Sequence, residues 1–259
     1  MAFNGSDESL TRVSHVKPLE PPPSWSILRH CSEGGQQARA DSIIAEEEAE
    51  MALSDLFGDI HLFFRWLHVI AGITWIGHLY FFNFVNVPLQ AALDDAGKKA
   101  VNPKLMPRAL WWFRWGAMFT FLAGLVLFTL VYMYTPGVGF DPSAAFRDAG
   151  GGISGPAMWI MMGALLGTIM WFNVWFIIWP AQQKILGGKA SAEELPAIRR
   201  RAYLASRTNT YLSGPMLFGM LAPSHFGAFD LPVLLVFAAV GLVLIWHAIK
   251  FSPKVGTSI

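Results

Sequence analysis

Apolar residues form five long runs along this chain, and the segments between the runs hold most of the charged residues. The runs cover residues 60–84, 113–134, 156–180, 210–223 and 231–250. A helix of about 20 apolar residues is long enough to cross the hydrocarbon core of a bilayer. The fourth run is short and contains Gly214, Pro215 and Gly219, so we expect it to be kinked or to begin one turn earlier. The pattern predicts an all-α membrane bundle of about five transmembrane helices.

Basic residues occur in alternate loops. Segments 87–112 and 181–209 and the C-terminal end carry Lys and Arg, whereas segment 135–155 has only Arg147 and segment 224–230 has none. Loops rich in Lys and Arg lie on the cytoplasmic side of membrane proteins. We therefore expect the N-terminus outside and the C-terminus in the cytoplasm. The protein is expected to be a multi-pass protein of the bacterial inner (cytoplasmic) membrane.

The first 50 residues lack the apolar pattern. They contain the proline-rich stretch "KPLEPPPSW" and the acidic run "AEEEAE", and they have no apolar segment of the kind found in a signal peptide. A composition of this kind does not form a packed core. We expect a disordered tail over residues 1–50 and a helical membrane domain over residues 51–259. Because Met51 begins "MALSDLFGDIHLFF", the true start of the protein is expected there.

Composition agrees with a membrane protein and limits the chemistry. Of the 259 residues, 54% are hydrophobic and 14% are charged, whereas soluble domains have about a quarter charged residues. A net charge of +1 gives no indication of a nucleic-acid partner. Membrane lipid is the expected partner of the apolar runs. The chain has one cysteine and no C-x-x-C-H motif, so covalent haem c is not expected. No zinc spacing, nucleotide-binding loop or nucleophile elbow occurs either.

The first apolar run, "RWLHVIAGITWIGHLYFFNF", contains ionisable residues that a simple membrane anchor does not need. Such residues usually face a bundle interior or a cavity. His68 and Trp75 lie seven residues apart, on one helix face with Gly72. In one hypothesis, His68 binds the iron of haem b, Gly72 leaves room for the macrocycle, and Arg65 pairs with the propionates. In the other, His68 hydrogen-bonds to a neighbouring helix and Gly72 is a packing contact.

Three further histidines are candidate cofactor ligands. His78 and His247 lie at similar depth near the cytoplasmic side, together with Asn173 of the third run. These three residues are expected to form a hydrogen-bonded polar layer or, alternatively, to ligate a second haem. His225 follows the fourth run on the outer side. It is a candidate second axial ligand, a proton relay or an ordinary loop residue.

Three long stretches resemble a known family. They are "WLHVIAGITWIGHLYFFNFVN", "MWFNVWFIIWPAQQKIL" and "SRTNTYLSGPMLFGMLAPSHF". They are similar to the N-terminal membrane domain of bacterial membrane-bound urate oxidases (urate hydroxylases), and the likeness covers roughly residues 55–250. In that family the membrane domain precedes a cytochrome c domain, and the enzyme converts urate to 5-hydroxyisourate. This sequence has no C-x-x-C-H motif, so the resemblance implies urate oxidation only with a separate cytochrome c or quinone as acceptor.

A shorter stretch, "LHVIAGITWIG", resembles the first helix of small haem-binding membrane proteins, including a bacterial protoporphyrinogen oxidase. That likeness implies a functional role for His68. The sequence as a whole predicts a membrane-embedded b-type haem module for electron transfer, related to the membrane part of urate hydroxylase. Two alternatives remain open. One is a non-catalytic subunit of a larger membrane complex, and the other is a small-solute transporter with His78 and Asn173 along its path.

Overall fold

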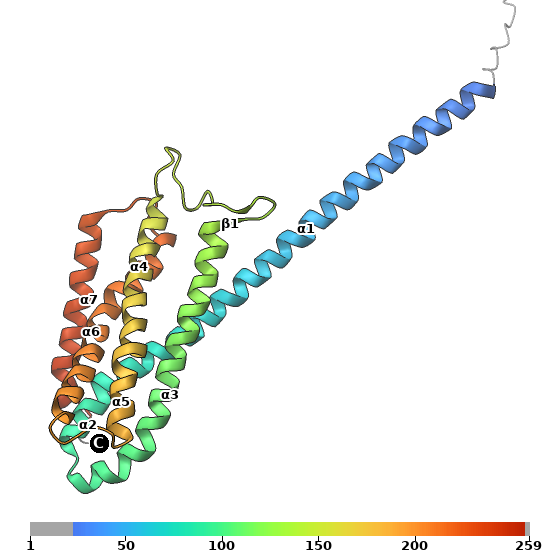
Figure 1. The fold of residues 1–259 in the computed structure, drawn as a ribbon. Helices are drawn as coiled ribbons and strands as arrows, with labels where there is room; N and C mark the ends of the chain where they lie inside the picture. The colour runs from blue at the N-terminus through green and yellow to red at the C-terminus, as the bar shows by residue number, and fades with distance from the viewer. Residues whose placement is uncertain (1–22, 257–259) are drawn as a thin grey trace, which may run out of the picture. The chain divides into compact units, whose positions relative to one another are not determined.

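The computed structural model describes residues 23–256, which are almost entirely helical (Figure 1). The α-helices are α1 (Pro23–Tyr80), α2 (Val87–Ala92), α3 (Asp95–Phe128), α4 (Gly155–Phe172), α5 (Trp179–Leu186), α6 (Leu195–Leu221) and α7 (Leu231–Phe251). Three π-helical segments continue the long helices, η1 (Phe81–Asn86), η2 (Thr129–Met133) and η3 (Asn173–Ile178). Two short 3₁₀ helices follow α6 and α7, η4 (Ala222–Ser224) and η5 (Ser252–Lys254).

The loop between η2 and α4 contains the one sheet among the described residues. Its strands β1 (Tyr134–Thr135) and β2 (Gly139–Phe140) pair antiparallel, with Tyr134 opposite Phe140. The hairpin uses Gly137, in the turn, and Gly139, the first residue of β2, at positive φ, a conformation that other residues rarely adopt. The predicted all-α class is therefore confirmed, with this hairpin as a minor addition.

Contacts divide the chain into two units, Met1–Asp55 and Leu56–Ile259. In the first unit, residues 23–50 form the beginning of α1, which differs from the predicted lack of structure. Residues 36–55 are all exposed, so this part of the helix depends on local preference, and its Ala and Glu residues are strong helix formers. Residues 1–22 of the predicted tail lie outside the described residues. The predicted start at Met51 stays a prediction.

Four helical segments of the described chain are long and apolar enough to cross a membrane. They are Gln36–Ala92, Asp95–Met133, Gly155–Leu186 and Leu231–Lys254. They contain four of the five predicted runs, and many of their Leu, Val, Ile and Phe side chains are exposed, as expected of surfaces that face lipid. The chain is thus a multi-pass membrane protein with an α-helical bundle. The outside position of its N-terminus stays a prediction.

The remaining predicted run, the fourth (residues 210–223), lies in α6, which differs from the other long helices. This helix begins at Leu195 rather than near residue 210, because Pro196 fits a first helical turn and three arginines favour helix after it. It packs against α4, α5 and α7 (Figure 1). Its buried face carries polar side chains, among them Asn209, Thr210 and Ser213. These residues lower its apolar content without exposing polar groups to lipid.

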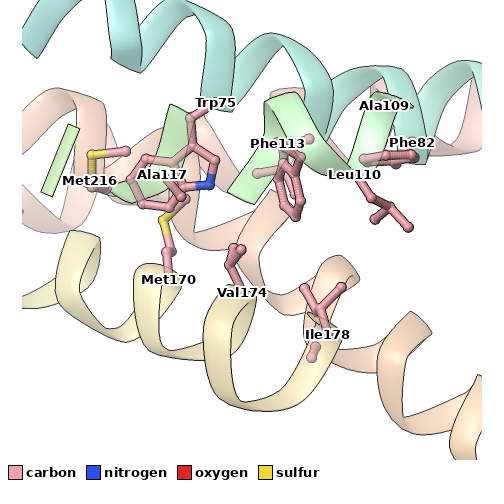
Figure 2. Close-up of a cluster of buried hydrophobic side chains, with 12 residues drawn as sticks. Trp75, Phe82, Ala109, Leu110, Phe113, Ala117, Met170, Val174, Ile178 and Met216 are labelled. Carbon is pink, nitrogen blue, oxygen red and sulfur yellow. The ribbon is translucent and has the colours of Figure 1, made fainter. Parts of the chain in front are cut away.

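Buried apolar side chains of α1, α3, α4, η3 and α6 form the core of the bundle. Figure 2 shows Trp75 of α1 and Phe113 of α3 facing Met170 and Val174, which lie at the junction of α4 and η3. Exposed fractions of these four side chains are between 0% and 3%, so the interface of α1 and α3 with α4 and η3 is closely packed. A core of this kind positions α1 against α3 along the segment that contains His68.

Glycines allow two pairs of helices to approach closely. A Cβ atom added to Gly219 of α6 would lie 2.9 Å from the Cα of Gly163 in α4. A Cβ atom added to Gly214 of α6 would lie 3.1 Å from the Cα of Gly241 in α7. Contacts of this type between small residues are a common basis of helix association in membranes. They explain why α6 lies so close to α4 and α7.

Candidate functional site

His68 lies between α1 and α3 and is partly buried. Its Nδ1 is 2.8 Å from the carbonyl oxygen of Thr120. A carbonyl oxygen can only accept a hydrogen bond, so Nδ1 carries the proton and donates it. The other ring nitrogen, Nε2, is then the basic nitrogen of the neutral imidazole. A metal-binding histidine commonly shows this pattern, with one nitrogen bonded to a carbonyl and the other free to ligate.

A stripe of small residues on α3 forms the surface against which His68 lies. A Cβ atom on Gly124 would be 3.0 Å from Cε1 of His68 and 3.2 Å from Nδ1, so only glycine leaves the ring in its place. Gly116, two turns earlier, would place a Cβ atom 3.0 Å from the backbone nitrogen of Trp75. Gly116, Thr120 and Gly124 are four residues apart and share one helix face. The apolar pattern of the sequence did not predict this stripe.

Gly72 faces the same stripe. A Cβ atom added to Gly72 would lie 3.8 Å from the methyl group of Thr120, which is an ordinary contact distance. In the structure, Gly72 therefore contributes to the packing of α1 on α3. Its predicted role in making room for a macrocycle stays a prediction.

Arg65 lies one helical turn before His68 and is exposed. Its Nη2 is 3.1 Å from Nε2 of His61, which accepts this hydrogen bond because a guanidinium only donates. The pair leaves other N–H groups of Arg65 available to an anionic group. The predicted pairing of Arg65 with haem propionates stays a prediction.

His78 lines a shallow groove between α1 and α3 with a volume of about 550 Å³. Its Nδ1 lies 2.8 Å from the carbonyl oxygen of Thr74 and donates to it, within the same helix. The groove also contains Trp112 and Arg108 of α3. His78 therefore has one basic ring nitrogen beside aromatic and cationic neighbours.

The other two candidate histidines lie elsewhere. His247 is exposed on α7, where its ring lies against that of Phe251, tilted by 33° and with 4.2 Å between the ring centroids. His225 is exposed just after η4. Neither residue lines the groove of His78. Across the described part of the chain, no three His, Cys, Asp or Glu side chains come close enough to hold a metal ion.

Asn173 pairs with α6 rather than with His78 or His247. Its Nδ2 donates to Oδ1 of Asn209 at 2.8 Å, and Nδ2 of Asn209 donates to the carbonyl oxygen of Met170 at 2.9 Å. Asn173 is the first residue of η3, and π-helical turns are frequent at functional sites. The described hydrogen bonds do not join Asn173 to His78 or His247, the other two residues of the predicted polar layer; its partner is Asn209.

A second set of polar contacts connects α6 to the end of α1 and to η1. Nδ2 of Asn83, in η1, donates to Oγ of Ser206 at 2.9 Å, and the hydroxyl of Tyr80 lies 2.9 Å from Oγ of Ser213. These pairs of residues were not predicted from the sequence. A signal was present, because Ser206, Asn209, Thr210 and Ser213 follow the spacing of one helix face within "SRTNTYLS".

Replacing Asn209 with Ala is expected to destabilise the bundle by roughly 1–2 kcal/mol. Asn209 is fully buried, and the change removes the hydrogen-bond acceptor of the half-buried Asn173 amide and one of the two donors to the Met170 carbonyl. The measurement is the free energy of unfolding in detergent micelles. Thr208→Ala is the matched control, because Thr208 is an exposed residue of the same helix. Equal stability of the two variants would contradict the prediction.

The comparison with known proteins identifies one family. Its description is Urate oxidase N-terminal, and it matches residues 92–145 and 149–251. The match covers more than half of the chain and includes α3, α4, α6 and α7, with His225 and His247. His68 and His78 of α1 lie before the matched residues. No curated protein and no solved structure matches the chain. The resemblance found in the sequence is confirmed, and the chain belongs to the urate oxidase N-terminal family.

Proposed function

We propose that this chain is a membrane-embedded b-type haem module for electron transfer, related to the membrane part of urate hydroxylases, with His68 as an axial ligand. The observation that carries the proposal is the hydrogen bond from Nδ1 of His68 to the Thr120 carbonyl. It holds the imidazole in the tautomer and orientation that a metal ligand needs. Family membership supports a redox role, because the family name refers to the oxidation of urate.

The residues around His68 fit an iron ligand. Gly124 contacts the ring on one side and fixes its position. Hydrogen bonds within residues 36–256 use Nδ1 and leave Nε2 for the iron. Arg65, one turn away, is exposed and would pair with the haem propionates. A bound haem would supply one-electron redox chemistry, with a potential set by its ligands and by the apolar surroundings.

The experiment that tests the proposal is the reduced-minus-oxidised absorption spectrum of the purified full chain. Sharp α and Soret bands are expected, because a ligated b-type haem changes its spectrum on reduction. A flat spectrum from folded protein expressed with ample haem would reject the proposal. It would favour a structural subunit of a larger complex or a small-solute transporter.

Replacing Gly124 with Ala is expected to disturb the haem site without removing its ligand. The new Cβ atom would lie about 3.0 Å from the imidazole, so the ring must shift and its bond to the Thr120 carbonyl must weaken. We expect a changed midpoint potential or a lower haem content. Gly77→Ala is the control, because a Cβ atom there has no neighbour within 4 Å. Identical potential and haem content in both variants would contradict this role of Gly124.

We also propose that urate turnover, where it occurs, requires an added electron acceptor. Oxidation of urate to 5-hydroxyisourate releases two electrons, whereas a haem iron accepts one at a time. This sequence contains no C-x-x-C-H motif for a second haem of the c type. Turnover is therefore expected with added cytochrome c or a quinone, and not with oxygen alone. Rapid turnover by the purified chain in oxygenated buffer without an acceptor would overturn this expectation.

A further inference from the structure

We propose that Arg207 binds the acid group of an anionic ligand in a cavity between η1, α2, α6 and the end of α7. The cavity has a volume of about 370 Å³, and its lining includes Asn83, Val87, Arg207, Ile249 and Ser252. It lies apart from His68, so the inference does not depend on the haem proposal.

The guanidinium of Arg207 has donors without acceptors. Its Nε and Nη1 are buried and have no hydrogen-bond partner among the described residues. Only Nη2 is used, donating to the hydroxyl of Tyr203 at 3.0 Å, and the Tyr203 ring lies 5.0 Å from the guanidinium carbon. Buried donors are nearly always paired in folded proteins, so unpaired ones indicate a missing acceptor. A cation whose donors are buried in a membrane protein has a particular need for an opposite charge.

The polar side chains that line the cavity with Arg207 are Asn83 and Ser252. Neither the carboxamide oxygen of Asn83 nor the hydroxyl oxygen of Ser252 accepts a hydrogen bond from Nε or Nη1 of Arg207. The amide nitrogen of Asn83 donates to Ser206 and to the Leu79 carbonyl. The hydroxyl of Ser252 donates to the carbonyl oxygen of Ile249 at 3.0 Å. Arg207 is therefore the free cationic donor of the cavity within the described chain.

The walls of the cavity limit the shape of the ligand. Apart from its three polar residues, the lining consists of Val, Ile, Ala and Pro side chains. Such walls suit a ligand with an anionic oxygen on an apolar or flat body. Two sources have this chemistry: an anionic lipid with its headgroup phosphate at Arg207, and a flat organic anion such as urate.

The test uses the full chain and two probes. In nanodiscs of zwitterionic lipid alone, equilibrium dialysis measures the binding of urate. In detergent, native mass spectrometry measures retention of added phosphatidylglycerol. We expect saturable binding of one probe by the wild-type chain and at least tenfold weaker binding by Arg207→Gln. Arg201→Gln is the control, because Arg201 is exposed on the same helix and does not line the cavity.

The probe that binds saturably identifies the source of the anion. The proposal is rejected if the wild-type protein binds neither urate nor phosphatidylglycerol saturably. It is also rejected if Arg207→Gln binds the probe as tightly as wild type does. If Arg207→Gln does not fold, Ile249→Trp replaces it, because the larger side chain fills the cavity and leaves the charge in place. Ile249→Trp is expected to weaken binding at least tenfold, and unchanged binding would reject the proposal. These binding measurements do not depend on haem, so the absence of haem bands from the absorption spectrum would not affect them.

Discussion

His68→Ala is expected to lower the haem content of the purified protein at least tenfold. The substitution removes Nε2, the nitrogen that the Thr120 hydrogen bond leaves free for iron. It leaves the backbone of α1 intact, because Ala is a strong helix former. The measurement is haem per chain from the pyridine haemochrome assay, at matched protein levels.

His247→Ala is the control for this experiment. His247 is exposed on α7 and contacts Phe251, so its loss should leave the haem content unchanged. His78→Ala should also retain the haem bound at His68. Full haem content in His68→Ala would reject the ligand assignment, whatever the activity of the variant.

Gly219→Ala is expected to destabilise the bundle by roughly 1–3 kcal/mol. The added Cβ atom would lie 2.9 Å from the backbone of Gly163 and 2.8 Å from Cε of Met162. The Met162 methyl group can move, but the backbone of α4 cannot move without separating α4 from α6. The measurement is the free energy of unfolding in micelles.

Gly77→Ala provides the comparison for Gly219→Ala. It makes the same chemical change in a helix, at a place with nothing within 4 Å of the new atom. A gain in helix propensity without a clash should leave its stability equal to wild type or slightly higher. If the two variants were equally stable, the close contact between α4 and α6 would not be a determinant of stability.

Much of the fold was predictable because an apolar run long enough to cross a membrane forms a helix, which satisfies its backbone hydrogen bonds within the segment. The runs at 60–84, 113–134, 156–180 and 231–250 all lie in long helices. The early start of α6 was not predicted, because the arginines before residue 210 suggested a loop. High hydropathy predicts a helix that faces lipid. The helix α6 instead packs against other helices, and its polar side chains Asn209, Thr210 and Ser213 are buried in the bundle.

The face of α1 that contains His68 and Gly72 was predicted from helical spacing, but its partner was not. That partner is the α3 stripe with Gly116 and Gly124, which sits among aromatic residues in the sequence. Which helix faces which depends on packing over a long sequence separation, and spacing within one helix carries no such information. The helix at residues 23–50 was missed for another reason. A polar sequence that forms no core can still have high helix propensity.

The most direct test of the haem proposal is imidazole rescue of His68→Gly, followed by the reduced-minus-oxidised spectrum. Glycine leaves a space where the side chain was, and free imidazole can enter it and supply the missing nitrogen. We expect α and Soret bands that are absent in His68→Gly, return with added imidazole, and depend on its concentration in a saturable way. Bands of wild-type intensity in His68→Gly without imidazole would contradict the account.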